Sequence, residues 1–130
     1  MKHNYLYDDG GRGEYFRMKY RSDRVGDCAV RALAIATKED YNLVRKELWE
    51  ISLQNGDMPN GKSTFEEFLF KRGFIKEKKI KGYNLGDYPV SKDEVYVVVL
   101  ANHYSCLDKG SIKDIWDCRE KYPYNTFRKP

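Results

Sequence analysis

The sequence predicts an α+β fold, with helices in its first half and strands in its second half. Apolar residues recur at helical spacing between residues 28 and 69, whereas residues 94–100 (EVYVVVL) form a run of strongly β-prone side chains. The length of 130 residues fits one domain over residues 1–130. With 41% apolar and 15% aromatic residues, the chain can build a hydrophobic core and is unlike a disordered protein.

The first 25 residues have no helical period and are rich in tyrosine, glycine and charge. We expect an irregular arm over residues 1–25 that contains His3 and contributes one short strand around Tyr15–Tyr20. The opening residues MKHNYLYDDG lack the apolar stretch of a secretory signal, and no apolar run reaches the roughly 18–20 residues of a membrane span. Three cysteines cannot all pair within one chain, which favours a reducing cytoplasm. We therefore expect a cytoplasmic protein with no membrane partner.

Two helices are expected after this arm. Asp27 is a good N-cap, and the segment CAVRALAIAT behind it is apolar on almost every side, which is typical of a buried central helix. Asp40 is the expected N-cap of the next helix. The apolar residues that share one face of that helix are Tyr41, Val44, Leu48 and Ile51.

A third helix and three strands complete the expected fold. Ser63–Glu66 has the pattern of a capping box after the loop QNGDMPNGK, and Gly73 is expected to end that helix. Residues 94–100 should form a central strand that is buried on both faces. Residues 103–107 and 111–116 flank a turn, so we expect them to form a hairpin.

The candidate chemistry centres on Cys28, which directly follows the N-cap of the first helix. A thiol is a strong nucleophile as the thiolate, and a helix N-terminus favours the thiolate through its free N–H groups and its dipole. His103, at the start of the second predicted strand, is the expected base. Asp114 and Asp117 are the candidate carboxylates that would orient the imidazole.

Strand register distinguishes the two carboxylates. If residues 109–110 form a two-residue turn, Ser105 lies opposite Asp114. Side chains alternate along a strand, so His103 shares the face of Ser105 and lies diagonal to Asp114, at a typical β-carbon separation of roughly 7–8 Å. Asp114 is therefore the first candidate. A turn that is longer by one residue swaps the faces, so Asp117 remains the second.

Four ordered motifs resemble a small phage and prophage family that is similar to papain-like cysteine peptidases. The motifs are GDCAVRALAIAT, DMPN, FLFKRGF and NHYSCLDKGSIKDIWDC, and the resemblance spans roughly residues 26–127. It implies a papain-like fold, in which a buried nucleophile helix packs on a small antiparallel sheet. It also implies a thiol-dependent hydrolase or acyl transferase that acts on a peptide or amide bond. In that enzyme Cys28 is the nucleophile, His103 the base, and Asp114 or Asp117 the orienting acid.

The implied chemistry needs no metal and no organic cofactor. Its substrate is expected to be a peptide or protein, and in the phage context a host protein in the host cytosol. Papain-like enzymes usually have a glutamine several residues before the nucleophile as an oxyanion donor, whereas no glutamine precedes Cys28. Ser22, Arg24 or the backbone N–H of Cys28 would have to serve.

A binding module is the alternative function. Such a module would keep the papain-like frame with weak catalysis, and would bind a host factor or nucleic acid through the basic segment Lys71–Lys81. That segment holds six lysines or arginines and one glutamate, while the rest of the chain has a net charge of about −1. A chain-wide nucleic-acid binder is usually more basic, so the charge supports one basic patch at most.

Two further interpretations concern single side chains. A zinc site would use His103, Cys106, Cys118 and Cys28. An odd separation puts His103 and Cys106 on opposite faces of a strand, which argues against that site. Arg31 lies one turn after Cys28, where its charge either favours the thiolate or pairs with Asp27 or Asp117.

Overall fold

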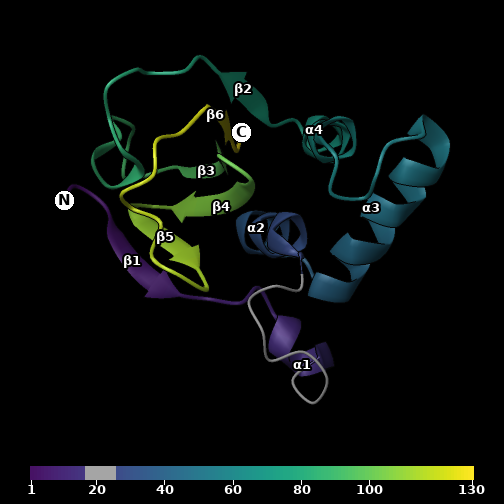
Figure 1. Cartoon of the computed structure of the whole chain (residues 1–130). Helices are drawn as coiled ribbons and strands as arrows, with labels where there is room; N and C mark the ends of the chain where they lie inside the picture. Colours follow the sequence, from purple (N-terminus) through teal and green to yellow (C-terminus); the bar gives the residue numbers. More distant parts are fainter. Residues whose placement is uncertain (17–25) are drawn as a thin grey trace.

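A six-stranded mixed sheet forms the centre of the protein in a computed structural model that describes residues 1–16 and 26–130 (Figure 1). The strand order is β1-β5-β4-β3-β6-β2; β1 and β5 are parallel, and the other pairs are antiparallel. The strands are β1 (Asn4–Tyr7), β2 (Ile75–Glu77), β3 (Val95–Leu100), β4 (His103–Asp108), β5 (Ser111–Asp114) and β6 (Asn125–Arg128). The predicted α+β class is confirmed, but the sheet is larger than expected and mixed rather than antiparallel.

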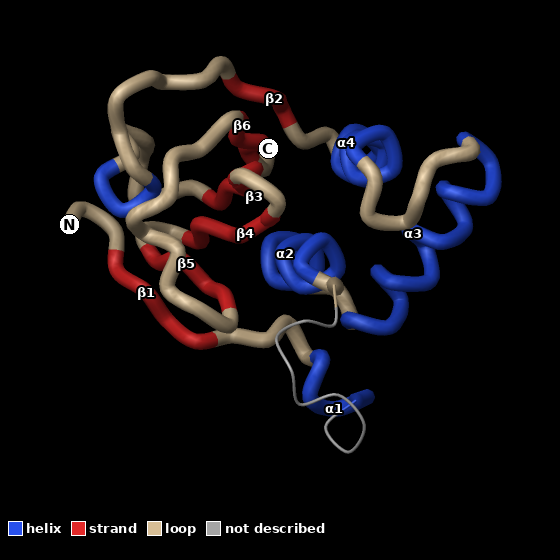
Figure 2. Tube along the Cα trace, viewed as in Figure 1, coloured by secondary structure: helices blue, strands red, loops and turns tan. Residues whose placement is uncertain are grey.

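Helices α2 (Cys28–Thr37), α3 (Tyr41–Asn55) and α4 (Lys62–Lys71) lie to one side of the sheet (Figure 2). Helix α2 packs against strand β4 and against α3, which in turn packs on α4. Asp40 caps α3 as predicted, because its carboxylate accepts hydrogen bonds from the backbone N–H groups of two following residues. All four residues of the predicted apolar face of α3 are buried. Among the described residues, every helix is too short or too polar to span a bilayer.

Strand β3 is the expected central strand, between β4 and β6 in the sheet. Its side chains alternate between two hydrophobic clusters, so both faces are covered. On the helical face, Val95 and Val97 join residues of α2, α3 and α4. On the other face, Tyr96 and Val98 join a cluster that includes Leu85 of the 3-10 helix η2 (Leu85–Asp87). The prediction of a strand buried on both faces is confirmed.

The β4–β5 hairpin has the two-residue turn on which the register argument depends. Asp108 pairs with Ser111, and Lys109 and Gly110 both have positive φ, of 49° and 85°. Two successive positive φ values are typical of a type I′ turn, whose twist matches that of the strands. Gly110 adopts such a conformation without the steric cost of a side chain. The register that favours Asp114 over Asp117 is therefore the one observed.

The N-terminal residues are not the irregular arm that we expected. Strand β1 pairs in parallel with β5, and helix α1 (Arg12–Phe16) follows it. His3 is fully buried, and its Nε2 lies 2.8 Å from the carbonyl oxygen of Tyr88. The expected strand around Tyr15–Tyr20 is wrong at its start, which is helical, and residues 17–20 lie outside the described part of the chain. Helix α1 begins because the Asp9 carboxylate accepts hydrogen bonds from two backbone N–H groups that follow it.

The start of α4 also differs from the prediction. Gly61 is the N-cap, and the Ser63–Glu66 capping box does not form. Instead, the carboxylate of Asp57 accepts a hydrogen bond from the backbone N–H of Ser63 at 3.1 Å, so a residue from the preceding loop satisfies the helix start. The predicted end is confirmed, because Gly73 follows the C-cap with a φ of +77°.

Candidate functional site

Cys28 is the first residue of α2, and its side chain is partly exposed. Its sulfur therefore lies at a helix start, where the first backbone N–H groups have no acceptor within the helix. Burial raises the pKa of the Cys28 thiol, whereas hydrogen bonding to the His103 side chain and the Tyr104 backbone lowers it. The positive charges of His103 and Arg31 lower this pKa further, so the net shift is downward. The site thus favours the thiolate.

His103 and Asp114 form a largely buried pair. Nε2 of His103 lies 2.6 Å from Oδ2 of Asp114, and the side chains are 10% and 3% exposed. Burial alone would lower the pKa of His103, but hydrogen bonding to Asp114 and to the thiols of Cys118 and Cys28 outweighs it and raises the pKa to about 11. Because Nε2 donates to the carboxylate, Nδ1 is the ring nitrogen left for a thiol.

Asp114 is held by several donors besides His103. Ser105 Oγ donates to Oδ2 at 2.7 Å, and the backbone N–H of Ile115 donates to Oδ1 at 2.7 Å. Nη2 of Arg31 lies 3.6 Å from Oδ1. Burial raises the pKa of Asp114, but the hydrogen bonds from His103 and Ser105 and the charge of His103 lower it, with a net downward shift. The carboxylate is therefore fixed in its charged form.

The two predicted carboxylates have different surroundings. Asp114 stands on β5 beside His103, as the strand-face argument predicted. Asp117 lies beyond the end of β5, is 42% exposed, and binds Nη2 of Arg119 at 2.7 Å. The hairpin turn has two residues rather than three, and the carboxylate that contacts the imidazole is that of Asp114, while Asp117 pairs with Arg119.

Arg31 performs both of the roles that the sequence left open. Its Nη1 donates to the carboxylate of Asp27, while its charge lowers the pKa of Cys28. The suggested pair with Asp117 is wrong, since Asp114 takes that place. Asp27 occupies the N-cap position, but its side chain does not cap α2. The Asp27 carboxylate also accepts hydrogen bonds from Arg12 at 3.2 Å and from the Tyr41 hydroxyl at 2.8 Å, which joins α1, α2 and α3 behind the site.

Trp116 lies against the imidazole. The ring centroids of His103 and Trp116 are 4.8 Å apart, with an angle of 46° between the rings. An indole at this position excludes water from one side of the His103–Asp114 hydrogen bond, and a lower local dielectric strengthens that bond.

Cys118 is a site residue that the sequence did not associate with Asp114. It is buried, and its Sγ lies 3.6 Å from Ser105 Oγ and 3.7 Å from Asp114 Oδ2. It follows the end of β5, so strand alternation gave no reason to place it there. Among the described residues, the candidate ligand atoms of His103, Asp114 and Cys118 lie within 4.8 Å of one another, so these three side chains could hold a metal ion.

The zinc set suggested by the sequence is only partly assembled. Cys106 packs in the core on the helical face of the sheet, and burial raises the pKa of its thiol. The predicted opposite orientation of His103 and Cys106 is thus confirmed.

Two of the candidate oxyanion donors, Ser22 and Arg24, lie outside the described residues. The backbone N–H of Cys28, in the first turn of α2, is the donor that the described part of the chain offers.

Comparisons of the chain with protein-family models, with curated proteins and with solved structures found no match.

Proposed function

We propose that this chain is a thiol-dependent hydrolase or acyl transferase that acts on a peptide or amide bond. The observation that carries the proposal is the largely buried His103–Asp114 pair, in which Nε2 of His103 lies 2.6 Å from Oδ2 of Asp114, together with the lowering of the Cys28 pKa by His103. A thiol at a helix start, an imidazole on a strand and a carboxylate on the neighbouring strand are the parts that nucleophilic thiol catalysis requires. The papain-like fold expected from the motifs in residues 26–127 belongs to the same proposal.

The first half-reaction forms a thioester on Cys28. The thiolate attacks the carbonyl carbon of the substrate, and the π electrons of the carbonyl group move to its oxygen as the C–S bond forms. The backbone N–H of Cys28 donates to that oxygen. The His103 imidazolium gives its proton to the leaving nitrogen as the C–N bond breaks. Asp114 holds the ring through Nε2, so Nδ1 is the nitrogen that transfers the proton.

The second half-reaction releases the acyl group. Neutral His103 takes a proton from water, whose oxygen attacks the thioester carbonyl, and the C–S bond breaks to return the Cys28 thiolate. In an acyl transferase, an amine or hydroxyl group of a second substrate replaces the water. All of these steps use the side chains of the site, the substrate and water. The phage-family resemblance favours a peptide or protein of the host cytosol as the substrate.

A set of short peptides that end in a vinyl sulfone tests this function. Each peptide should modify Cys28 covalently, which mass spectrometry of the intact protein and its fragments detects. Cys28→Ser should abolish the adduct, and His103→Ala should slow its formation by about 10²-fold or more, because the base contributes that much in acid–base catalysis. Cys106→Ala is the matched control, because Cys106 packs in the core on the helical face of the sheet, and it should react like the wild type. Equal rates for wild type and His103→Ala, or adducts on Cys118 instead of Cys28, contradict the proposal.

A further inference from the structure

Two segments that are far apart in the sequence lie side by side beyond the β2–β6 pair. Residues 78–84 connect β2 to η2, and residues 119–124 lead into β6 (Figure 1). The backbone N–H of Leu85 donates to the carbonyl oxygen of Lys121 at 2.7 Å. At the other end, Nζ of Lys79 lies 5.1 Å from the centre of the Tyr124 ring. The two segments therefore form one continuous surface.

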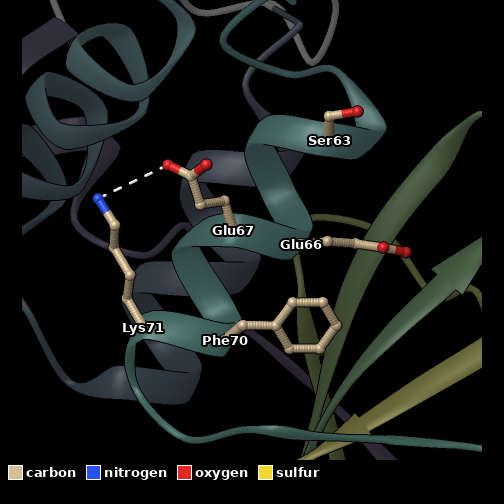
Figure 3. Close-up of a pocket in the computed structure, with 5 residues that line it drawn as sticks. All are labelled: Ser63, Glu66, Glu67, Phe70 and Lys71. Carbon is tan, nitrogen blue, oxygen red and sulfur yellow. Dashed lines mark ion pairs between the residues drawn. The ribbon is translucent and has the colours of Figure 1, made fainter. Parts of the chain in front are cut away.

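The basic segment predicted over Lys71–Lys81 is not basic along its whole length. Its first three cations pair with glutamates, as Lys71–Glu67 (3.6 Å), Arg72–Glu39 (2.6 Å), Arg72–Glu47 (2.7 Å) and Lys76–Glu66 (3.0 Å). Figure 3 shows Lys71 and Glu67 joined on α4, beside a shallow depression that Glu66 also lines. Paired cations and exposed carboxylates make this part of the segment a poor site for a polyanion.

The remaining lysines of this basic segment, Lys78, Lys79 and Lys81, lie on the first of the two adjacent segments. Lys121 lies on the second, and all four side chains are exposed. Within the part of the chain that the structure describes, none of the four has a carboxylate within ion-pair distance. Glu120 is the acidic residue among them, and Asp117 nearby is neutralised by Arg119. This surface therefore keeps a net positive charge.

Three tyrosines are exposed on the same two segments. Tyr83, Tyr122 and Tyr124 are 45%, 58% and 49% exposed. A large ring that is half in water has an unused face on which a planar group can stack. We call the four lysines and three tyrosines together the lysine–tyrosine surface.

We propose that the lysine–tyrosine surface binds single-stranded nucleic acid, with the lysines near phosphates and the tyrosine rings stacked on bases. Unpaired cations interleaved with exposed rings are the combination that single-stranded chains recognise without sequence preference. A duplex fits less well, because its bases are stacked inside and these loops offer no helix to enter a major groove. This inference goes beyond the proposed hydrolase activity and concerns residues outside that site.

Fluorescence anisotropy with a fluorescein-labelled oligothymidylate of about 15 nucleotides tests the inference with the full chain. Binding should be measurable at about 50 mM salt and should weaken as salt is added, because each neutralised phosphate releases a counterion. Four lysines predict a slope of log K against log salt of about −3 for a single strand. Cys28→Ser should bind like the wild type, so this result stands whether or not the chain is a hydrolase.

Two double charge-reversal variants distinguish binding at the lysine–tyrosine surface from attraction by the net charge of the protein. Lys79→Glu with Lys81→Glu should weaken binding by about 10-fold or more at about 50 mM salt and should reduce the salt slope. The matched control is Lys46→Glu with Lys62→Glu, the same charge change at exposed positions on α3 and α4, and it should change affinity less than about 3-fold. Tyr122→Ala and Tyr124→Ala should each weaken binding by about 5- to 100-fold, since each removes a stacking ring.

Three results would overturn the inference. One is no binding of the wild type at low salt. Another is an equal loss in the two charge-reversal pairs, since the effect would then be net charge alone. The third is competition by polyglutamate as effective as competition by oligothymidylate at equal charge, which would identify an acidic protein as the partner. Circular dichroism of each variant confirms that the fold is unchanged.

Discussion

Nη2 of Arg31 lies 3.6 Å from Oδ1 of Asp114, inside the protein, where the two side chains are 4% and 3% exposed. Arg31 is on α2, one turn after Cys28, so the helix that carries the nucleophile also carries the cation that faces the carboxylate of the site. Its Nη1 donates to Asp27, so two buried carboxylates share one guanidinium. The charge of Arg31 therefore couples the stability of the fold to the chemistry of the thiol.

Arg31→Met should destabilise the protein strongly. Removing one partner of a buried ion pair typically costs about 3–5 kcal/mol, because the remaining charge is left buried and unpaired. Here both Asp27 and Asp114 lose a partner. Urea titration should show this loss in the free energy of unfolding. Arg31→Lys should recover part of it, since an ammonium group restores the charge but cannot replace the planar guanidinium that contacts both carboxylates.

The Arg119–Asp117 pair is the control for this experiment, because it is the same type of pair on the surface. Exposed ion pairs contribute little to stability. Arg119→Met should therefore leave the free energy of unfolding unchanged within error. A loss in Arg31→Met no larger than that in Arg119→Met would show that Arg31 does not hold the two carboxylates.

His103→Ala should raise the pKa of Cys28. The imidazole lowers that pKa through a hydrogen bond and through its charge, and the variant lacks both. Alkylation by iodoacetamide follows the thiolate, so the rate should fall at about pH 6–7 and approach that of the wild type near pH 10. Rates measured across this pH range give the pKa. An unchanged pH profile would mean that the two side chains do not interact.

The two aspartates should differ in the same assay. Asp114→Asn keeps an oxygen near Nε2 but removes the charge that stabilises the imidazolium, so we expect a smaller slowing than for His103→Ala. Asp117→Asn should change nothing, since Asp117 binds Arg119 at the surface. A response of Asp117→Asn equal to that of Asp114→Asn would contradict the assignment of the orienting acid.

The two histidines should give opposite dependences of stability on pH. Burial lowers the pKa of His3, so the stability that it supports is present above the unfolded-state value of about 6.5 and is lost as the pH falls through the lowered folded-state value. The stability that His103 supports depends on pH in the opposite sense. Despite burial, its hydrogen bonds raise its pKa to about 11, so its stabilisation is complete below about pH 6.5 and is lost as the pH rises toward 11.

Urea unfolding at about pH 5, 7 and 9 in a Cys28→Ser background separates these effects, because the Cys28 thiol no longer titrates there. His3→Gln keeps a donor for the Tyr88 carbonyl and should remove the loss of stability between about pH 7 and 5. His103→Gln should remove the loss between about pH 7 and 9. If His103→Gln instead leaves that loss unchanged, the raised pKa of His103 is wrong.

The parts of the fold that the sequence predicted are those with local signals. Strand β3 (VYVVVL) consists of β-prone and apolar residues, the Asp40 cap lies next to the helix that it starts, and the β4–β5 turn is set by Lys109–Gly110. Strands β1 and β6 have four residues each and depend on distant partners, β5 for the first and β3 for the second. Such short segments contain too few residues to show a period, so only tertiary pairing reveals them.

The candidate site divides in the same way. Alternation along two strands that share a tight turn was enough to place His103 beside Asp114. The position of Cys118 could not be obtained from strand alternation, because the chain beyond β5 follows no repeating geometry. The Asp27 side chain was also misjudged, since propensity favours a cap whereas the structure uses it to bind Arg31, Arg12 and Tyr41.

The three thiols should react with iodoacetamide in an order set by exposure and pKa. Cys28 is partly exposed and its pKa is lowered, so it should be alkylated first at about pH 6.5. Cys106 is fully buried, and burial raises its pKa; Cys118 is 1% exposed beneath Ser105 and Asp114. These two should react only when the protein unfolds, so their alkylation rates should rise steeply with urea, while the rate of Cys28 should fall toward that of an ordinary thiol.

Peptide mass spectrometry after timed labelling measures all three rates. Modification of Cys106 or Cys118 before Cys28 in the folded protein would mean that Cys28 is not the activated thiol, and the proposed mechanism would then lose its nucleophile.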